Sequence, residues 1–321
     1  MVMSQIMPPQ RIASLLAGGT EILYGLGLGE RVVAVSHECD YPEEVRAKPR
    51  ATFTNITVDA TSRSIDEQVK SLTSTGAPIY SIDVELLASL RLDLIVTQSQ
   101  CNVCAVSYND VLAAVQTNPA LRSTIVVALN PTTLEGVFED ILRVGEAAGC
   151  RKRAEEYVAE LRGRVEAIRS KTAGLPASER PRVACIEWIE PVMIAANWMP
   201  EMVQIAGGQN GLTRPGAKSA YSHWDDVVAY NPEVIVVMPC GFDLPRTIEE
   251  AKALTSFPGW TNLAAVRNGR VYAVDGNAYF NRSGPRIVDS LEILAQLLHP
   301  GLFPEVVKPK TTFDNRVRAR L

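Results

Sequence analysis

The sequence has no long apolar run and no excess of positive charge. No uninterrupted apolar segment reaches the roughly 18 residues that a membrane-spanning helix needs. The chain has 321 residues, with 32 Lys and Arg against 36 Asp and Glu, and a formal net charge of −4. Phosphate binding requires a concentrated basic face, and only the tail KPKTTFDNRVRARL is locally basic. We therefore expect no membrane span, no nucleic-acid partner and a frayed C-terminal tail.

Signals for export and for catalysis are also missing. The segment MVMSQIMPPQRIASLLAGG lacks a basic region followed by an apolar core and a cleavage site, and no lipobox cysteine is visible. As written, the chain is expected to be cytoplasmic; it would be extracytoplasmic if its native start were missing. GxSxG, P-loop and HExxH motifs are absent, as is a GxGxxG after the first expected strand. The sequence therefore offers little support for nucleophilic catalysis.

Cysteine and histidine are scarce. The six cysteines are too few and too scattered for a small disulfide scaffold, so we expect reduced thiols. One CxxC pair follows the apolar run LDLIV, whereas a structural zinc site of this kind usually has two paired motifs. A metal site, a redox pair and small apolar side chains beside a ligand all stay open, and the last is favoured. We expect no resident metal; the residues that could supply ligands to one are His37, Cys39, Cys101, Cys104 and His223.

Apolar strands alternate with helix-period segments, which is typical of an α/β protein with mostly parallel sheets. The expected strands are 11–16, 31–36, 92–98, 124–129, 182–188, 191–196, 233–239 and 270–276. The pattern predicts two Rossmann-like lobes with central, mostly parallel sheets, joined by a long backbone helix. The expected parts are an N-terminal lobe at 11–130, a helical linker at 131–174, a C-terminal lobe at 175–299 and a tail at 300–321.

The linker carries two helical periods and no strand signal. The first helix spans 132–149, with Thr132 or Thr133 as its N-cap. The second spans about 22 residues, roughly 33 Å at the rise of an α-helix, so we expect it to lie across both lobes. Its apolar stripe consists of Ala154, Val158, Leu161, Val165 and Ile168.

The two halves of the chain resemble each other. Residues 81–98 and 222–239 share an acidic residue, a short helix and then a strand, so that Glu85 aligns with Asp225. A weaker similarity aligns Glu21 with Glu201. A chain built from two similar units has a natural cleft between them, and ligands of parallel sheets bind outside the carboxyl ends of the strands.

Aromatic residues are concentrated at the expected strand ends, together with polar anchors such as Asn277 and Arg282. Such a surface suits a large planar molecule rather than a sugar phosphate or an amino acid. The aromatic residues are Tyr41, Trp188, Trp198, Trp224, Tyr279 and Phe280.

Several of these segments together resemble the class III substrate-binding proteins, the helical-backbone receptors of importers for cobalamin, haem and ferric siderophores. The cobalamin-binding branch is the nearest match. The resemblance covers about residues 11 to 299 in order, and it is more specific for the fold than for the ligand. It is carried by RIASLLAGGTEILYGLGLGERVVAVSHECDYP, LDLIVTQSQCNVCAVS, the long helix, NPEVIVVMPCGFDL and GRVYAVDGNAYFNRSGPRIVDSLEIL.

The resemblance implies a corrinoid site formed by both lobes. Tyr41 would press on the corrin from the first lobe and Trp188 from the second, and the run after LDLIV would form the floor. Whether Cys101, His37 or His223 ligates cobalt stays open. The implied ligand-binding residues are Tyr41, Gln98, Gln100, Cys101, Trp188, Trp198, Tyr279, Phe280 and Arg282.

The resemblance also implies docking onto an ABC permease through Glu85 and Asp225, one carboxylate from each lobe. We expect a monomer that binds cobalamin or a related corrinoid without catalysis, for ABC-type uptake or intracellular corrinoid handling. Two alternatives stay open. One is a haem- or ferric-siderophore-binding protein, and the other is a cytosolic metal-dependent protein that uses Cys101 and Cys104.

Overall fold

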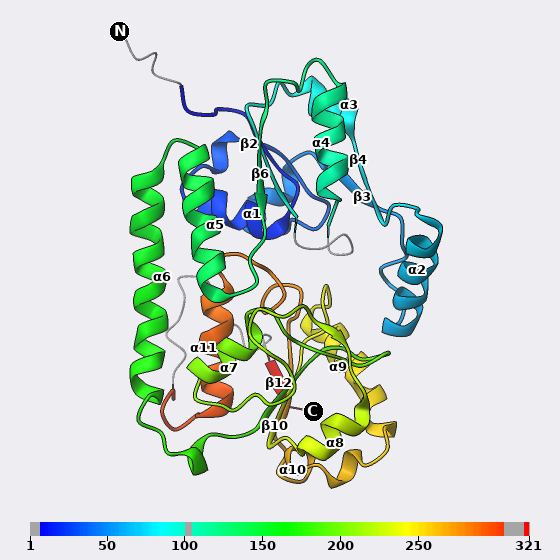
Figure 1. Cartoon of the computed structure of the whole chain (residues 1–321), viewed down its shortest axis with the longest axis vertical. Coiled ribbons are helices and arrows are strands. Elements are labelled where there is room, and N and C mark those ends of the chain that lie inside the picture. The colour runs from blue at the N-terminus through cyan, green and yellow to red at the C-terminus, as the bar shows by residue number, and fades with distance from the viewer. Residues whose placement is uncertain (1–6, 100–104, 305–317, 321) are drawn as a thin grey trace.

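The computed structural model describes residues 7–99, 105–304 and 318–320 and contains two α/β lobes (Figure 1). Lobe 1 comprises the described residues up to 130, and lobe 2 comprises those from 175 onward. A pair of helices connects the lobes along one side of the molecule. The predicted fold class is confirmed. No helix in the described part of the chain is long and apolar enough to cross a membrane.

Lobe 1 is built on a four-stranded parallel sheet with the strand order β2-β1-β5-β6. Ile12 pairs with both Val32 and Leu94, which places β1 inside the sheet. The inner strand β5 is buried along its whole length, as expected for a parallel sheet covered on both faces. The elements are β1 (Ile12–Ser14), α1 (Ala17–Gly25), β2 (Val32–Val35), α3 (Val84–Ser89), β5 (Leu94–Gln98), α4 (Tyr108–Thr117) and β6 (Ile125–Leu129).

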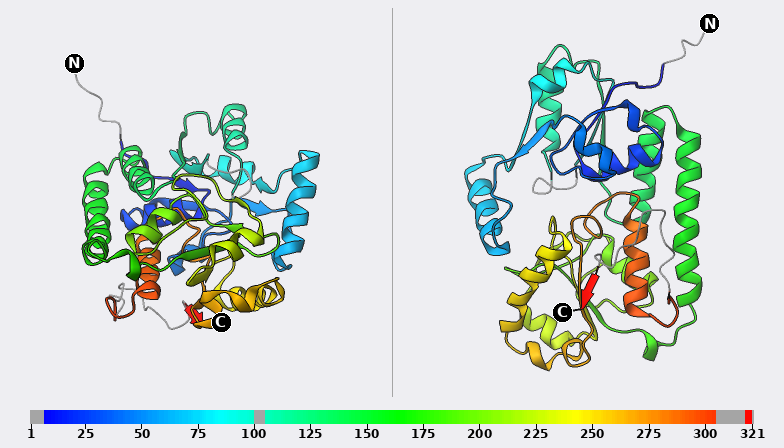
Figure 2. Two further views of the ribbon diagram at one scale, coloured as in Figure 1. Left: turned by 60° about the horizontal axis from the view of Figure 1, so that its bottom comes forward. Right: turned by 180° about the vertical axis from the view of Figure 1, so that it is seen from behind.

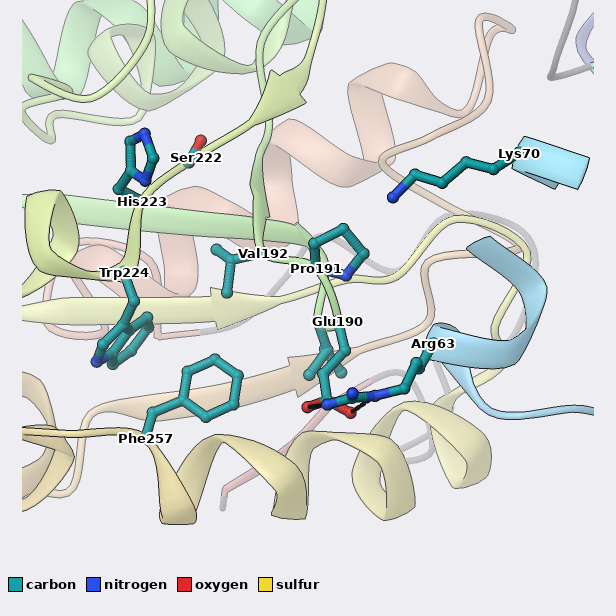
Figure 3. Close-up of a pocket in the computed structure, with 10 residues that line it drawn as sticks. Arg63, Lys70, Glu190, Pro191, Val192, Ser222, His223, Trp224 and Phe257 are labelled. Atoms are coloured by element: carbon teal, nitrogen blue, oxygen red, sulfur yellow. Dashed lines mark hydrogen bonds and ion pairs between the residues drawn. The ribbon is translucent and has the colours of Figure 1, made fainter. Parts of the chain in front are cut away.

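A helical arm extends from lobe 1. The antiparallel strands β3 (Thr52–Thr54) and β4 (Tyr80–Ile82) carry between them the helix α2 (Ser62–Thr75). In Figures 1 and 2 this helix stands away from the lobe 1 sheet and reaches lobe 2, on the side opposite the connecting helices. A pocket separates part of α2 from lobe 2 (Figure 3). The arm is absent from the sequence-based prediction, because its apolar residues Ile65, Val69 and Leu72, although at helical spacing, are few among hydroxyl and charged residues.

Lobe 2 contains a six-stranded sheet with the order β12-β11-β10-β7-β8-β9. Its three central strands are parallel, with Ile235 paired to both Ala184 and Val271, and the outer strands are antiparallel. The strands are β7 (Val183–Trp188), β8 (Met193–Ile194), β9 (Ala220–Tyr221), β10 (Val234–Val237), β11 (Val271–Val274) and β12 (Arg318–Arg320). The helices are α7 (Met199–Ile205), α8 (Trp224–Tyr230), α9 (Leu244–Ala251), α10 (Ala264–Arg267) and α11 (Ile287–Leu298).

The end of the chain is part of the lobe 2 sheet. Strand β12 pairs antiparallel with β11, with Arg320 opposite Tyr272. The expectation of a frayed tail is therefore wrong for these residues. The physical reason is that an edge strand presents unpaired backbone groups, which another extended segment can satisfy.

The connecting helices α5 (Leu134–Ala147) and α6 (Arg151–Thr172) form a spine across both lobes. The predicted N-cap of α5 is confirmed, because the Thr133 hydroxyl accepts a hydrogen bond from the Gly136 N–H at 3.0 Å. The predicted stripe of α6 is buried and belongs to a core cluster that also contains residues of α1, α7 and α11. Arg164 adds ion pairs to Asp289 and Glu292 on α11. The spine thus packs against both lobes.

We expect Leu161→Ala, in the buried stripe of α6, to lower the free energy of unfolding by about 2–5 kcal/mol, because it leaves a cavity between the spine and the lobes. Urea denaturation followed by circular dichroism measures the change. Lys152→Ala, on the exposed face of the same helix, is the matched control and should change stability by less than about 0.5 kcal/mol. Equal stability of both variants would refute this packing role of α6.

Candidate functional site

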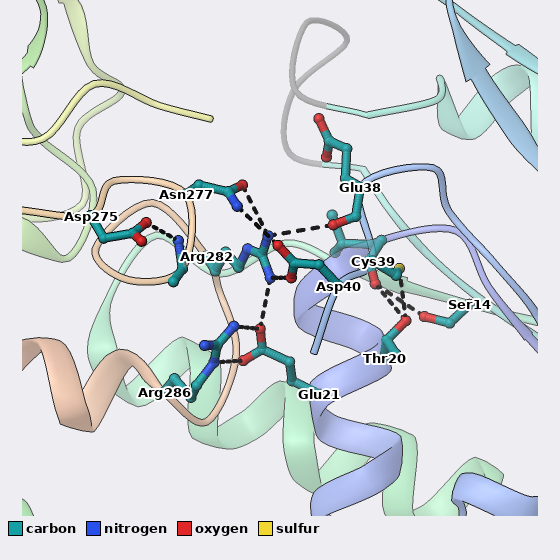
Figure 4. A network of polar contacts seen from close by, with 12 residues as sticks. Ser14, Thr20, Glu21, Glu38, Cys39, Asp40, Asp275, Asn277, Arg282 and Arg286 are labelled. Carbon is teal, nitrogen blue, oxygen red and sulfur yellow. Dashed lines mark hydrogen bonds and ion pairs between the residues drawn. The ribbon is translucent and has the colours of Figure 1, made fainter. Parts of the chain in front are cut away.

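Loops at the carboxyl ends of strands from both lobes meet between the lobes (Figure 4). Lobe 1 contributes Glu21 in α1 and Asp40 after β2, and lobe 2 contributes Asn277, Arg282 and Arg286 from the segment between β11 and α11. We call these five residues the interlobe network. Because ligands of parallel sheets bind at this edge, the network marks the candidate binding site.

The Glu21 carboxylate is the centre of the network. It accepts two hydrogen bonds from Arg286, from Nε at 3.0 Å and from Nη2 at 2.6 Å. Arg282 Nη1 lies 3.2 Å from the same carboxylate and 2.6 Å from Asp40 Oδ1. One carboxylate of lobe 1 thus holds two guanidinium groups of lobe 2.

Asn277 connects the remaining polar atoms. Its amide nitrogen donates to Asp40 Oδ2 at 3.0 Å, and its amide oxygen accepts from Arg282 Nη2 at 3.0 Å. The same Arg282 nitrogen lies 3.4 Å from the main-chain oxygen of Glu38. The guanidinium of Arg282 is therefore bonded on both of its terminal nitrogens.

The network is buried at its centre, so its charges depend on one another. The side chains of Glu21 and Arg282 are 2% and 8% exposed. Burial would raise the pKa of Asp40, but the hydrogen bond and charge of Arg282 hold it below its usual range. Desolvation would lower the pKa of Arg282, but Glu21 and Asp40 raise it. Removing one member of such a cluster leaves an uncompensated buried charge.

The two lobes approach each other closely beside the network. A Cβ on Gly18 would lie 2.7 Å from the Ser283 main-chain oxygen, and a Cβ on Gly284 would lie 3.1 Å from Gly18 Cα. Only glycine allows the two backbones this approach. The separation of the lobes at this point is therefore set by backbone contact.

Two of the predicted aromatic residues lie close to Arg286. Its guanidinium carbon is 4.0 Å from the centre of the Tyr41 ring and 5.3 Å from that of Tyr279. Both tyrosines are partly exposed. The structure thus brings together Tyr41 from lobe 1 with Tyr279 and Arg282 from lobe 2.

The other predicted aromatic residues lie elsewhere. Phe280 is fully buried and Trp198 is 6% exposed, and the Trp198 indole donates to the Phe280 main-chain oxygen at 2.8 Å. These two residues fix the loop that carries Tyr279 and Arg282. Trp188 instead contacts the arm: its indole nitrogen donates to the Ser62 main-chain oxygen at 3.2 Å. Its ring lies 5.3 Å from that of Phe242.

The predicted floor of the site is described only in part. Gln98 ends β5 and is 4% exposed. Its side-chain nitrogen lies 3.5 Å from the Val106 main-chain oxygen. Gln100, Cys101 and Cys104 lie outside the described residues.

The described metal-ligand candidates are separate from one another. Cys39 is buried beside the Thr20 hydroxyl, and desolvation raises the pKa of its thiol to about 11. His37 Nδ1 lies 2.7 Å from the Thr52 hydroxyl, and burial together with the charge of Arg50 lowers the pKa of this histidine. His223 is exposed at the start of α8. Within the described part of the chain, no three His, Cys, Asp or Glu side chains gather as a metal site.

Glu38 places a further carboxyl group at this interface. In Figure 4 its side chain points away from Arg282, although its main-chain oxygen faces that residue. Desolvation raises the pKa of Glu38 to about 7; Arg282 opposes this shift and Asp40 adds to it. The group therefore takes up a proton more readily than an ordinary glutamate.

Glu85 and Asp225 occupy equivalent places in the two lobes. Glu85 lies in the first turn of α3 and Asp225 in the first turn of α8, and both are exposed. Negative charge is favourable at these helix starts in any case. Their geometry is compatible with contacts to another protein.

Glu21, Asp40 and Arg286 are site residues that the sequence analysis does not assign. A signal for Glu21 exists, because it aligns with Glu201 in the internal similarity. In the structure both carboxylates make contacts between separate parts of the chain: Glu201 accepts from the Leu134 N–H of the spine at 3.1 Å. Asp40 adjoins the predicted site residue Tyr41, but nothing in the local sequence indicates its partner.

Comparison with known proteins gives a family match over most of the chain. The family model described as periplasmic binding protein matches residues 12–278. An ABC transporter substrate-binding lipoprotein of Bacillus subtilis, YvrC, is 25% identical over 92% of this chain and 82% of its own. A cobalamin-binding protein of Halobacterium salinarum is 26% identical over 91% of this chain and 70% of its own. A periplasmic haem-binding protein from Pseudomonas aeruginosa has a TM-score of 0.68 at 18% identity, over 91% and 94% of the two chains.

The expectation of a cytoplasmic protein is wrong. The matched family is one of periplasmic binding proteins, and the Bacillus subtilis relative is a lipoprotein. The expectation rested on the missing export signal, whereas the family match rests on residues 12–278.

We expect Glu21→Gln to lower the free energy of unfolding by about 3–5 kcal/mol, because the buried Arg282 and the partly buried Arg286 lose their shared counter-charge. Glutamine keeps the shape of the side chain, so the change isolates the charge. Urea denaturation measures it. Glu43→Gln, at an exposed position of the same lobe, is the control and should change stability by less than about 0.5 kcal/mol. A loss for Glu21→Gln no larger than that of the control would contradict the role of the network.

The raised pKa of Glu38 predicts that the free energy of unfolding depends on pH. Between its ordinary pKa of 4.5 and its raised pKa of about 7, the folded protein retains a proton that the unfolded chain releases. Ionisation of Glu38 therefore lowers stability as the pH rises through this window, and the loss is complete above it. Glu38→Gln should gain stability over the wild type progressively from pH 4.5 to 7, measured by urea denaturation. A difference that does not vary with pH would refute the raised pKa of Glu38.

Proposed function

The chain belongs to the periplasmic binding protein family, and we propose that it binds cobalamin or a related corrinoid between its lobes for delivery to an ABC permease. As a member of this family it is a substrate-binding protein rather than an enzyme. The proposal depends on the interlobe network and on the tyrosines beside it.

The charge balance of the site is the observation that carries the choice of ligand. The carboxylates of Glu21 and Asp40 match the guanidinium groups of Arg282 and Arg286, so the network has no net charge to offer an anion. Glu38 adds only acidic character. A corrinoid, whose rim consists mainly of neutral amides, fits such a site better than a ligand that carries several carboxylates.

The polar and aromatic groups suit the same ligand. Tyr41 and Tyr279 are partly exposed and can offer ring faces to a macrocycle. Amides of the ligand can exchange hydrogen bonds with Asn277, and with Glu38 when it is protonated. The cobalamin-binding relative from Halobacterium salinarum supports this choice, because its similarity extends over 91% of the chain.

Haem is the second candidate, since the fold is shared with a periplasmic haem-binding protein. Haem carries two propionates, and the two arginines of the network are already paired. Binding it would require one pair to separate. We therefore favour a corrinoid over haem as the ligand.

The proposed permease contacts are Glu85 and Asp225. They are exposed, lie on different lobes and begin short helices in equivalent positions. A partner protein that binds both carboxylates therefore contacts both lobes and depends on their relative position.

We expect the purified protein to retain cyanocobalamin after desalting, with one equivalent bound per chain as read from its visible absorbance. Equilibrium dialysis with cyanocobalamin and haem in parallel should give a lower Kd for cyanocobalamin. Tyr41→Ala should raise that Kd by about tenfold or more, because it removes a large aromatic contact.

Tyr230→Ala is the matched control, because Tyr230 lies at the end of α8 and its hydroxyl bonds to the Gln209 main-chain oxygen. This variant should bind as the wild type does. If the protein retains haem but not cyanocobalamin, the proposed ligand is haem instead of a corrinoid. Retention of neither would refute the proposed ligand class.

A further inference from the structure

The arm helix α2 belongs to lobe 1 by chain connection but is attached to lobe 2. It hangs from lobe 1 between β3 and β4, and in Figure 1 and both views of Figure 2 it extends beside lobe 2. The spine helix α6 lies on the opposite side of the molecule in the same views. The lobes are therefore bridged on two sides, by the spine on one and by α2 on the other.

The start of α2 makes three hydrogen bonds with lobe 2. The Ser62 N–H donates to Glu250 Oε2 at 3.1 Å, and the Trp188 indole donates to the Ser62 oxygen at 3.2 Å. Arg246 donates to the Ala60 main-chain oxygen at 2.5 Å. Side chains of lobe 2 thus satisfy backbone groups at the beginning of the helix.

Side chains along α2 add further contacts with lobe 2. Arg63 forms an ion pair with Glu190 at 2.8 Å. The Tyr221 hydroxyl donates to Asp66, and Lys70 lies 4.6 Å above the Tyr221 ring. Trp188, Glu190 and Tyr221 all lie within or just after strands of the lobe 2 sheet.

The hydrogen bonds and the ion pair of α2 surround a contact that is incompletely packed. A pocket of about 380 Å³ lies between Arg63 and Lys70 of α2 and lobe 2 residues that include Pro191, His223 and Phe257 (Figure 3). The hydroxyl of Ser62 is buried without a hydrogen-bond partner among the described residues. Contacts between domains that are polar and loosely packed usually permit relative motion. This attachment is therefore suited to release, unlike the apolar core around α6.

We propose that α2 is a releasable latch, which holds the lobes together on the side opposite the spine and limits exchange of the ligand between them. The effect on ligand exchange rests on the proposed function, whereas the attachment of the helix to lobe 2 does not. When α2 is attached, movement of lobe 2 away from lobe 1 must break the contacts of Ser62, Arg63 and Asp66. When it is released, the lobes are held by the spine and the interlobe network alone.

The first test measures attachment without any ligand. The latch variant combines Arg63→Gln, Asp66→Asn and Tyr221→Phe, which removes the Arg63–Glu190 ion pair and the Tyr221–Asp66 hydrogen bond without changing the net charge. A helix of 14 residues is marginally stable in water when it is not packed. Hydrogen–deuterium exchange of residues 62–70 should therefore accelerate by about tenfold or more in this variant.

The matched control combines Glu67→Gln with Ser74→Ala, at exposed positions of the same helix. It should exchange as the wild type does. Equal exchange in the latch variant and the wild type would overturn the proposal, because the contacts would then not hold the helix.

The second test measures ligand exchange by stopped-flow mixing with cyanocobalamin. Association and dissociation rates should both rise by about tenfold or more in the latch variant, with a smaller change in Kd. Faster exchange of the helix with unchanged ligand rates would overturn the latch and leave α2 as a structural arm. Absence of binding by the wild type would refute the proposed function and the gating role together. The hydrogen-exchange result would still decide whether the contacts hold α2.

Discussion

The pairing of one buried carboxylate with a buried and a partly buried guanidinium group determines how the lobes meet. Glu21 contributes the carboxylate from lobe 1, and Arg282 and Arg286 reach it from a single loop of lobe 2. Charges removed from water require partners at hydrogen-bond distance, so the loop cannot shift far without a large loss of free energy. The contact of Gly18 with Ser283 and Gly284 sets the same separation through the backbone. Charge pairing and steric contact thus define one position of the lobes.

This arrangement also determines the chemistry that the site offers. Because Arg282 and Arg286 are paired with carboxylates within the network, the groups beside them are two partly exposed tyrosines, the Asn277 amide and a glutamate with a raised pKa. The network lies between a spine packed through an apolar core and an arm held by separate polar contacts. Motion between the lobes is therefore expected to occur mainly on the side of the arm.

The sequence predicts those features of the fold that depend on the spacing of apolar residues along a single helix or strand. The stripe of α6 from Ala154 to Ile168 and the apolar strands of both sheets follow from residue spacing, because burial of one face has a fixed period. Contacts between residues that are far apart in the sequence do not follow from residue spacing. Glu21 meets Arg282 and Arg286 from 261 and 265 residues away, and no local pattern indicates that contact. Aromatic residues at strand ends can face a site or a core, and local sequence does not distinguish the two: Tyr41 and Tyr279 contact Arg286, whereas Trp198 and Phe280 are buried.

A crystal structure of the protein with cyanocobalamin tests the central claim most directly. The account predicts the corrin ring between the segment that carries Tyr41 and the segment that carries Tyr279, with both arginines still paired to Glu21. A ligand bound on another surface, or lobes separated with these pairs broken in the complex, would contradict it.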